Sequence, residues 1–167
     1  MNPKAKLYIK QLQLSPHPEG GYFREVYRSD ETITHSNLPS RYSSSRGFST
    51  AIYFLLEGSE VSKFHRLKSD EQWHFYDGST LILYTIDKDG TLKKTLIGNK
   101  IENGETFQVN IRHGTWFGAE LIDNTSFALI GCTVAPAFQF NDFELAKRKD
   151  FLKDFPMHKD LIIKLTD

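Results

Sequence analysis

Short apolar-rich runs follow one another through the middle of the chain, each about the length of a β-strand. Turn residues separate several of them, and Asp89-Gly90 is the strongest hairpin signal. Strands that recur every roughly 8–12 residues without intervening helices indicate an antiparallel sandwich or barrel. The eight runs are Phe48–Leu56, Val61–Leu67, Glu71–Tyr76, Thr80–Asp87, Leu92–Ile97, Thr106–Ile111, Thr115–Leu121 and Ser126–Ala135.

The two ends of the chain have a different pattern. Residues 3–14 carry leucines among Lys and Gln and predict a short amphipathic helix, and residues 21–28 predict a strand rich in rings. Residues 30–45 are polar and irregular, which is typical of a lid or an arm across an interface. Asn141, with Glu144 three residues on, predicts a helix N-terminus, and residues 145–155 then have helical spacing.

Length and charge narrow the function classes. The 167 residues are expected to form one domain, residues 1–167, and 21 Lys and Arg balance 21 Asp and Glu. A balanced charge argues against nucleic acid as the main partner. The longest apolar run, residues 51–56, is too short to cross a membrane, and the N-terminal residues lack the apolar core of a signal peptide, so we expect a cytoplasmic protein without a membrane partner.

Aromatic residues are the unusual part of the composition. They make up 13% of the chain, with 13 Phe against 2 Trp. Rings of this number must be buried, so the composition predicts an aromatic core. The single cysteine, Cys132, lies in an apolar strand and is interpreted as a buried hydrophobe rather than a nucleophile.

The candidate chemistry is concentrated around a histidine and a glutamate. His65 ends one predicted strand and Glu71 begins the next, so a hairpin would bring the two side chains together. Side chains alternate along a strand, which predicts that Glu71, Trp73 and Phe75 share the interior face while His74 lies outside.

The same residues resemble a known motif. The spacing His65-x-Leu67-x3-Glu71-x6-Gly78 is similar to the first cupin motif, and the stretch 104–117 is similar to the second. Five blocks in order resemble the cupin-5 family, a domain family of unknown function, over residues 7–146. These blocks are His17-Pro18-Glu19-Gly20-Gly21-Tyr22-Phe23-Arg24-Glu25, Phe64-His65-Arg66-Leu67, residues 70–76, residues 114–121, and residues 131–136 ending in 142–146.

The resemblance implies a fold and an assembly. It implies an all-β double-stranded β-helix, the cupin jelly-roll barrel, with its motif-bearing core at about residues 17–146 and short helices at both ends. It also implies a homodimer, in which the N-terminal segment and residues 30–45 would be arms across the interface.

The departures from the cupin pattern bear on the mechanism. Metal-binding cupins use two histidines and a glutamate from the first motif and a histidine from the second, but here Leu67 and Phe117 stand at two of the histidine positions. His74 and His113 are the candidates to complete a metal site. Two remaining ligands are fewer than a closed site needs, so we expect no metal and no cofactor.

The leading hypothesis is a cupin that binds a small polar metabolite, such as a sugar derivative. Metal-independent sugar-nucleotide epimerases of the cupin superfamily use a barrel histidine as a base, so the resemblance makes an isomerase or epimerase with catalytic His65 and Glu71 possible. The acid would be one of Tyr22, Tyr53, Tyr76 and Tyr84. A metal-dependent oxygenase or isomerase and a non-catalytic dimeric sensor are the alternatives. The expected binding residues are Trp73, Phe75, Phe117, Tyr22 and Arg24.

Overall fold

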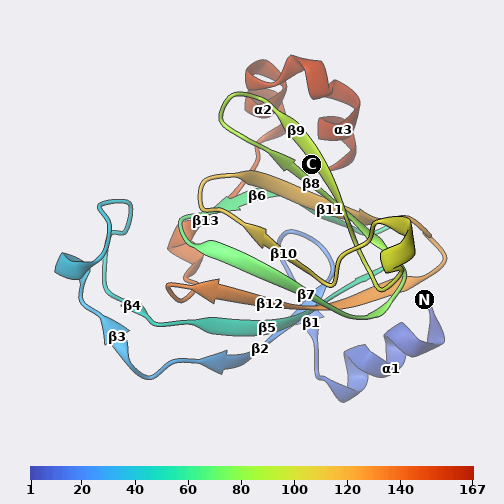
Figure 1. Ribbon diagram of the computed structural model, residues 1–167, viewed down its shortest axis with the longest axis horizontal. Coiled ribbons are helices and arrows are strands. Elements are labelled where there is room, and N and C mark those ends of the chain that lie inside the picture. Colours follow the sequence, from blue (N-terminus) through green and yellow to red (C-terminus); the bar gives the residue numbers. More distant parts are fainter.

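Two β-sheets face each other in the computed structural model, which describes residues 1–167 (Figure 1). The larger sheet has the order β1-β2-β5-β12-β7-β10, and the smaller has the order β13-β6-β11-β8-β9. The chain thus has the all-β jelly-roll architecture that the sequence predicts. The larger sheet comprises β1 (Ser15–Pro16), β2 (Tyr22–Arg28), β5 (Thr50–Glu57), β12 (Phe127–Ala135), β7 (Asp70–Gly78) and β10 (Gln108–Ile111). The smaller comprises β13 (Phe143–Leu145), β6 (Val61–Leu67), β11 (Trp116–Leu121), β8 (Leu81–Ile86) and β9 (Leu92–Ile97).

Every one of the eight predicted runs is a strand, and their apolar character has a simple cause. The N-terminal helix packs on part of the outer face of the larger sheet, so a strand such as β5 is buried on each side there. Phe54 and Leu56 of β5 pack in the core between the sheets, whereas Leu55 packs on the outer face. This double burial explains why residues 51–56 form an unbroken apolar run rather than an alternating one.

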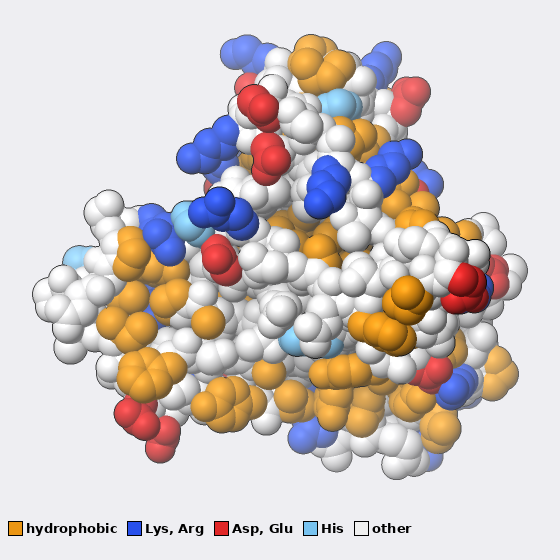
Figure 2. All heavy atoms as spheres, in the orientation of Figure 1, with side chains coloured by type: hydrophobic (Ala, Val, Ile, Leu, Met, Phe, Trp, Pro, Cys, Tyr) orange, Lys and Arg blue, Asp and Glu red, His pale blue; other side chains and the backbone are white.

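Helices provide the outer cover. Helix α1 (Pro3–Gln11) places Ala5 against the outer face of the larger sheet, and α2 (Arg148–Asp154) and α3 (Lys159–Lys164) cover the smaller sheet with Phe151 and Ile162. None of these helices combines the length and the apolar character needed to span a bilayer. Acidic and basic side chains lie side by side over the two C-terminal helices, at the top of Figure 2.

The N-terminal helix and the hairpin at Asp89-Gly90 are confirmed, but the predicted start of the C-terminal helix is wrong. Residues 143–145 extend the smaller sheet as β13, and α2 begins only at Arg148. Asn141 does not cap a helix, because residues 140–142 form a single turn of 3-10 helix and residues 143–145 then pair with β6. The neighbouring Asp142 is held by Arg46, a tertiary contact that the local sequence signal does not show.

Short elements complete the chain. Within the polar segment 30–45 and just after it, β3 (Thr32–Ile33) and β4 (Arg46–Gly47) pair with each other and form a small arm (Figure 1). Four single turns of 3-10 helix are η1 (His35–Asn37), η2 (Ile101–Asn103), η3 (Phe140–Asp142) and η4 (Pro156–His158).

A β-bulge in β6 decides which of its side chains enter the barrel. Phe117 pairs with His65, but Ala119 pairs with Ser62, so β6 has one more residue than its partner in this stretch. Ser62 and His65 are three residues apart and would face opposite sides of a regular strand, yet both are buried on the inside. Gly118 lies against the bulge, where an added Cβ would be 2.9 Å from the carbonyl oxygen of Ser62.

A buried ion pair fastens the arm to the barrel. Arg46 donates from Nε and Nη2 to the two carboxylate oxygens of Asp142, at 2.6 and 2.7 Å, and from Nη1 to backbone and side-chain oxygens of Ser44. The Arg46 side chain has no exposed surface and that of Asp142 is 2% exposed. Because a buried guanidinium without its partner is costly, this pair holds the arm and the segment around residue 142 together.

We expect Asp142→Asn to lower the free energy of unfolding by about 3 kcal/mol, because an amide leaves the buried charge of Arg46 uncompensated. Urea denaturation followed by tryptophan fluorescence measures this loss. Glu144→Gln is the matched control, since Glu144 is 56% exposed and pairs with Arg66 at the surface. The control should change stability by less than about 0.5 kcal/mol. Equal effects of the two substitutions would contradict the assignment.

Candidate functional site

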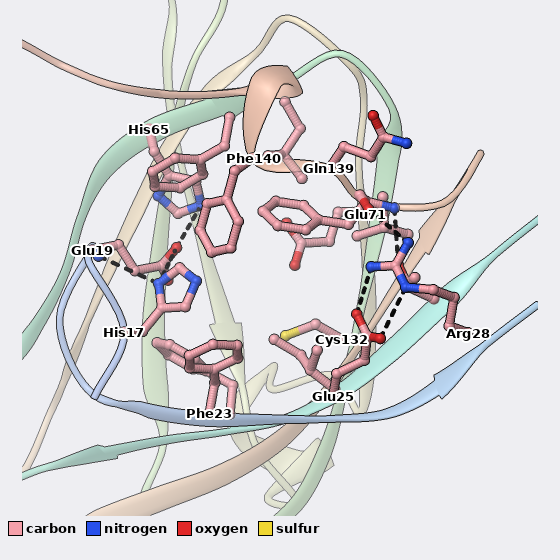
Figure 3. Close-up of a pocket in the computed structure, with 17 residues that line it drawn as sticks. His17, Glu19, Phe23, Glu25, Arg28, His65, Glu71, Cys132, Gln139 and Phe140 are labelled. Carbon is pink, nitrogen blue, oxygen red and sulfur yellow. Dashed lines mark hydrogen bonds and ion pairs between the residues drawn. The ribbon is translucent and has the colours of Figure 1, made fainter. Parts of the chain in front are cut away.

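A cavity of about 220 Å³ lies between the sheets at one end of the barrel (Figure 3). Strands β2, β5, β7 and β12 form one wall, β6 and β13 form the opposite wall, and residues 138–140 lie at the side. Most of the lining is apolar and aromatic, which is typical of a small-molecule site with few polar groups. The apolar members are Phe23, Ile52, Phe54, Leu67, Cys132, Val134, Phe138, Phe140 and Phe143, and the polar members are His17, Glu19, Glu25, Arg28, Thr50, His65, Glu71 and Gln139.

A tight turn before β2 brings His17 and Glu19 into this cavity. Gly20 and Gly21 have φ values of 110° and 68°, which lie in a region that favours glycine. A Cβ on Gly20 would be 2.1 Å from the carbonyl oxygen of Val61, so the turn can lie against β6 only with glycine there. The Gly-Gly pair is thus a requirement of the backbone, and its effect is to place Glu19 beside the β6 bulge.

Glu19 is the centre of a buried polar cluster. Its Oε1 accepts a hydrogen bond from Ser62 Oγ at 2.7 Å, and its Oε2 lies 3.2 Å from His65 Nε2 and 3.4 Å from His17 Nδ1 (Figure 3). His65 Nδ1 donates to the carbonyl oxygen of Lys63 at 2.7 Å. Glu19 and His65 are 6% and 2% exposed, so the cluster is shielded from water.

Burial opposes charge on all three groups of this cluster. It lowers the pKa of His65 to about 3 and the pKa of His17 to about 4. For Glu19, burial first and the nearby carboxyl of Glu71 second raise the pKa well above its ordinary value, against the opposing hydrogen bond from Ser62. At neutral pH the two imidazoles are therefore neutral, and burial favours the protonated form of the Glu19 carboxyl.

Glu71 lies across the cavity from this cluster (Figure 3). Burial raises its pKa to about 7, and the Trp73 indole and the Cys132 thiol oppose that rise. Burial, together with Glu71 and Glu19, raises the pKa of the Cys132 thiol, so this cysteine stays protonated. Glu71 is thus poised between its acid and carboxylate forms at neutral pH, which suits a group that exchanges protons.

The one arginine of the cavity is already engaged. Arg28 donates to both carboxylate oxygens of Glu25, at 2.9 and 2.7 Å, and to the carbonyl oxygen of Phe138 at 3.1 Å. A bulge at Val26 gives β2 one extra residue, which turns Glu25 and Arg28 to the same side. No unpaired cation therefore faces the interior.

Comparison with known proteins is consistent with this architecture. The family described as Cupin superfamily (DUF985) matches residues 6–146, most of the chain. The chain belongs to this cupin family. The uncharacterized protein YML079W of Saccharomyces cerevisiae is 32% identical over 157 residues, which cover 87% of this chain and 76% of the yeast protein.

Solved structures resemble this cupin over nearly its whole length. Protein SO0799 from Shewanella oneidensis has a TM-score of 0.88 at 39% identity, covering 98% of this chain and 97% of that one. A hypothetical protein from Leishmania major has a TM-score of 0.86 at 32% identity, covering 97% and 98%. Oxalate decarboxylase from Bacillus subtilis, at 15% identity and a TM-score of 0.55, covers 90% of this chain and 36% of its own and shares only the fold.

The predicted site residues fall in three places. His65 and Glu71 line the cavity. Trp73, Phe75 and Phe117 are buried in the core between the sheets and do not line it, although the Phe117 ring lies 4.0 Å from that of His65 between centroids. The predicted alternation along β7 is confirmed, since Glu71, Trp73 and Phe75 are buried while His74 is half-buried on the other face.

The remaining expected residues lie away from the cavity. Tyr22 packs against the cluster under α1, and Arg24 is exposed and donates to the carbonyl oxygen of Leu12. None of the four tyrosines considered as an acid lines the cavity. The predicted hairpin between His65 and Glu71 is wrong, because β6 and β7 belong to different sheets. The two side chains reach the same cavity from opposite walls.

Sequence reasoning did not assign His17 and Glu19 to the site. Both lie in the block His17-Pro18-Glu19-Gly20-Gly21, far along the chain from the cupin motifs. The available signal was the pair of glycines directly after a glutamate, since a strained turn is where a chain approaches another element closely. That signal indicates a turn but does not show which strand the turn meets.

The donor set does not fit the metal that many cupins bind. Leu67 and Phe117 stand at two ligand positions, His113 is bound to Asp70, and His74 faces the other side of β7. Both nitrogens of His65 are already directed at Lys63 and Glu19. No three His, Cys, Asp or Glu side chains gather into a metal-binding group. We therefore derive no step through a metal.

Glu71 makes the stability of this cupin depend on pH. Because its folded pKa of about 7 lies above its unfolded value, its contribution is full below the unfolded value and is lost as pH rises through about 7. The free energy of unfolding of Glu71→Gln, taken relative to that of the wild type, should therefore be about 3 kcal/mol higher at pH 8 than at pH 5. Urea denaturation at both pH values measures it. The exposed Glu102→Gln should show no such change, and a pH-independent effect of Glu71→Gln would refute the assignment.

Proposed function

We propose that this cupin binds a small, polar, uncharged metabolite in the barrel cavity. The observation that carries the proposal is a cavity of about 220 Å³ in which an apolar, aromatic wall surrounds polar groups on two opposite sides. A liquid water occupies about 30 Å³, so the space is that of roughly seven waters, close to a monosaccharide or a small hydroxy-carbonyl compound.

The polar groups define how such a ligand would be held. His17 Nε2 has no hydrogen-bond partner in the protein, and its Nδ1 accepts the backbone N–H of Glu19 at 3.3 Å, so its proton is on Nε2. Across the cavity, Glu71 offers a carboxyl group. A ligand between them would give an oxygen acceptor to His17 and a hydroxyl or an acidic C–H to Glu71.

This arrangement supports proton transfer without a cofactor. Glu71, with a pKa of about 7, takes a proton from the carbon next to a carbonyl, while a hydrogen bond from His17 to the carbonyl oxygen stabilises the developing negative charge. Return of the proton to a different position or face of the ligand isomerises or epimerises it. In this proposal Glu71 is the base, and His65 contributes by holding Glu19 in place.

Binding should depend on the donor at His17. His17→Phe keeps a ring among Phe23, Phe54 and Phe143 but removes the N–H, so we expect about a tenfold weaker affinity. Calorimetry or a thermal-shift titration with hits from a panel of monosaccharides, polyols and hydroxy ketones measures it. His74→Phe on the outer face of β7 is the control and should bind like the wild type. The binding proposal would be contradicted if every hit bound His17→Phe with the affinity of the wild type, or if the panel gave no hits.

Catalysis is tested separately, with a ligand that binds. In D₂O, the wild type should exchange the hydrogen next to the ligand's carbonyl for deuterium, because Glu71 shares its proton with solvent between turnovers. Glu71→Gln should slow this exchange by at least about a hundredfold, the usual contribution of a general base. Proton NMR of the ligand follows the exchange. A bound ligand that never exchanges would instead favour a non-catalytic binding or sensor module.

A further inference from the structure

The protons in the polar cluster can be assigned from the hydrogen bonds alone. The carbonyl oxygen of Lys63 can only accept, so His65 must carry a proton on Nδ1. In a neutral ring, Nε2 of His65 is then a bare acceptor, and it lies 3.2 Å from Glu19 Oε2. An acceptor this close to a carboxyl oxygen requires a proton between the two atoms.

His17 leads to the same conclusion from another direction. The backbone N–H of Glu19 donates to His17 Nδ1, so this nitrogen is also an acceptor, and it lies 3.4 Å from the same Oε2. The other carboxyl oxygen, Oε1, accepts from Ser62 Oγ. An ionised Glu19 would therefore hold its Oε2 against two nitrogen lone pairs with no donor on that side.

The alternative is an ion pair between an ionised Glu19 and a protonated histidine. Such a pair would be almost completely buried, because the side chains of His65 and Glu19 are 3% and 8% exposed. Burial opposes both charges, since it lowers the pKa of each histidine and raises that of Glu19. The other titratable groups that face Glu19 are Glu71 from β7 and Cys132 from β12, and neither supplies a positive charge.

We propose that Glu19 is a neutral carboxylic acid that donates its Oε2 proton to His65 Nε2 and keeps His17 as an Nε2–H donor facing the cavity. Glu19 is thus a positioning residue. Because its own proton goes to His65, Nδ1 of His17 stays free to accept the backbone N–H of Glu19. The single proton of the His17 ring therefore stays on Nε2, on the side of the ligand. The ligand atom next to His17 is then a carbonyl or hydroxyl oxygen, and this last clause alone rests on the proposed function.

The tautomers give a direct test without any ligand. In ¹⁵N-labelled wild-type protein at pH 7, long-range ¹H–¹⁵N spectra of the imidazoles should show His65 with its proton on Nδ1 and His17 with its proton on Nε2. Both rings should be neutral. An imidazolium spectrum for either ring would overturn the proposal.

Glu19→Gln is the informative variant because an amide reproduces the proposed acid. Its oxygen would accept from Ser62, and its NH₂ would donate toward the two histidine nitrogens that Oε2 now faces. We expect a melting temperature within about 2 °C of the wild type at pH 7 and the same two tautomers. Glu19→Leu is the matched control of similar size, and it should melt at least about 5 °C lower because Ser62 and His65 lose their partner.

The outcomes separate the two proposals. If Glu19→Gln melted as low as Glu19→Leu, or if its histidines changed tautomer, Glu19 would be needed as a carboxylate and the inference would fail. The melting and tautomer measurements need no metabolite, so a failed ligand screen would count against the proposed function and leave the assignment of Glu19 intact.

Discussion

Burying a charge between two β-sheets costs free energy, and the cavity of this cupin has two buried carboxyls, Glu19 and Glu71, and two imidazoles on its walls. The only buried charge pair with strong geometry, Arg46 with Asp142, lies outside that cavity and fastens the arm. Inside, no free cation balances the carboxyls, because Arg28 is bound to Glu25. The interior groups therefore stay mostly neutral, and the hydrogen-bond pattern of the cavity follows from that constraint.

Backbone irregularities place these groups. A regular β6 could not turn both Ser62 and His65 inward, and a regular β2 could not turn both Glu25 and Arg28 inward. The Gly20-Gly21 turn then presses Glu19 against the bulged part of β6. The two bulges interrupt strand ladders and the turn precedes β2, yet all three bring polar groups to the same cavity, so the departures from regular structure coincide with the candidate chemistry.

Much of the fold could be predicted from the sequence because it depends on local patterns. Strand-length apolar runs and turn residues sufficed for β5 to β12, and alternation placed Glu71 inside and His74 outside. The site could be predicted only in part. His65 and Glu71 lie at motif positions, but His17 and Glu19 reach them through a turn whose contact with β6 no pattern encodes. The bulges could not be predicted either, because an extra residue in one strand is recognised only from its pairing with the neighbouring strand. The same limit explains the error at Asn141, because residues 143–145 pair with the distant β6 and the neighbouring Asp142 binds Arg46, almost a hundred residues away.

Folding of this cupin moves protons between residue types in its cavity. Between about pH 4.5 and 6.5 the unfolded chain has protonated histidines and ionised glutamates, whereas the folded cavity has neutral His17 and His65, protonated Glu71 and, in the proposed arrangement, protonated Glu19. Two protons are bound in either state, so these four groups together make stability nearly independent of pH in that window. A metal-binding cupin compensates its buried carboxylate with a cation. Here Leu67 and Phe117 stand at two ligand positions, and in the proposed arrangement His65 accepts the proton of the Glu19 acid while His17 keeps its own proton on the side of the cavity.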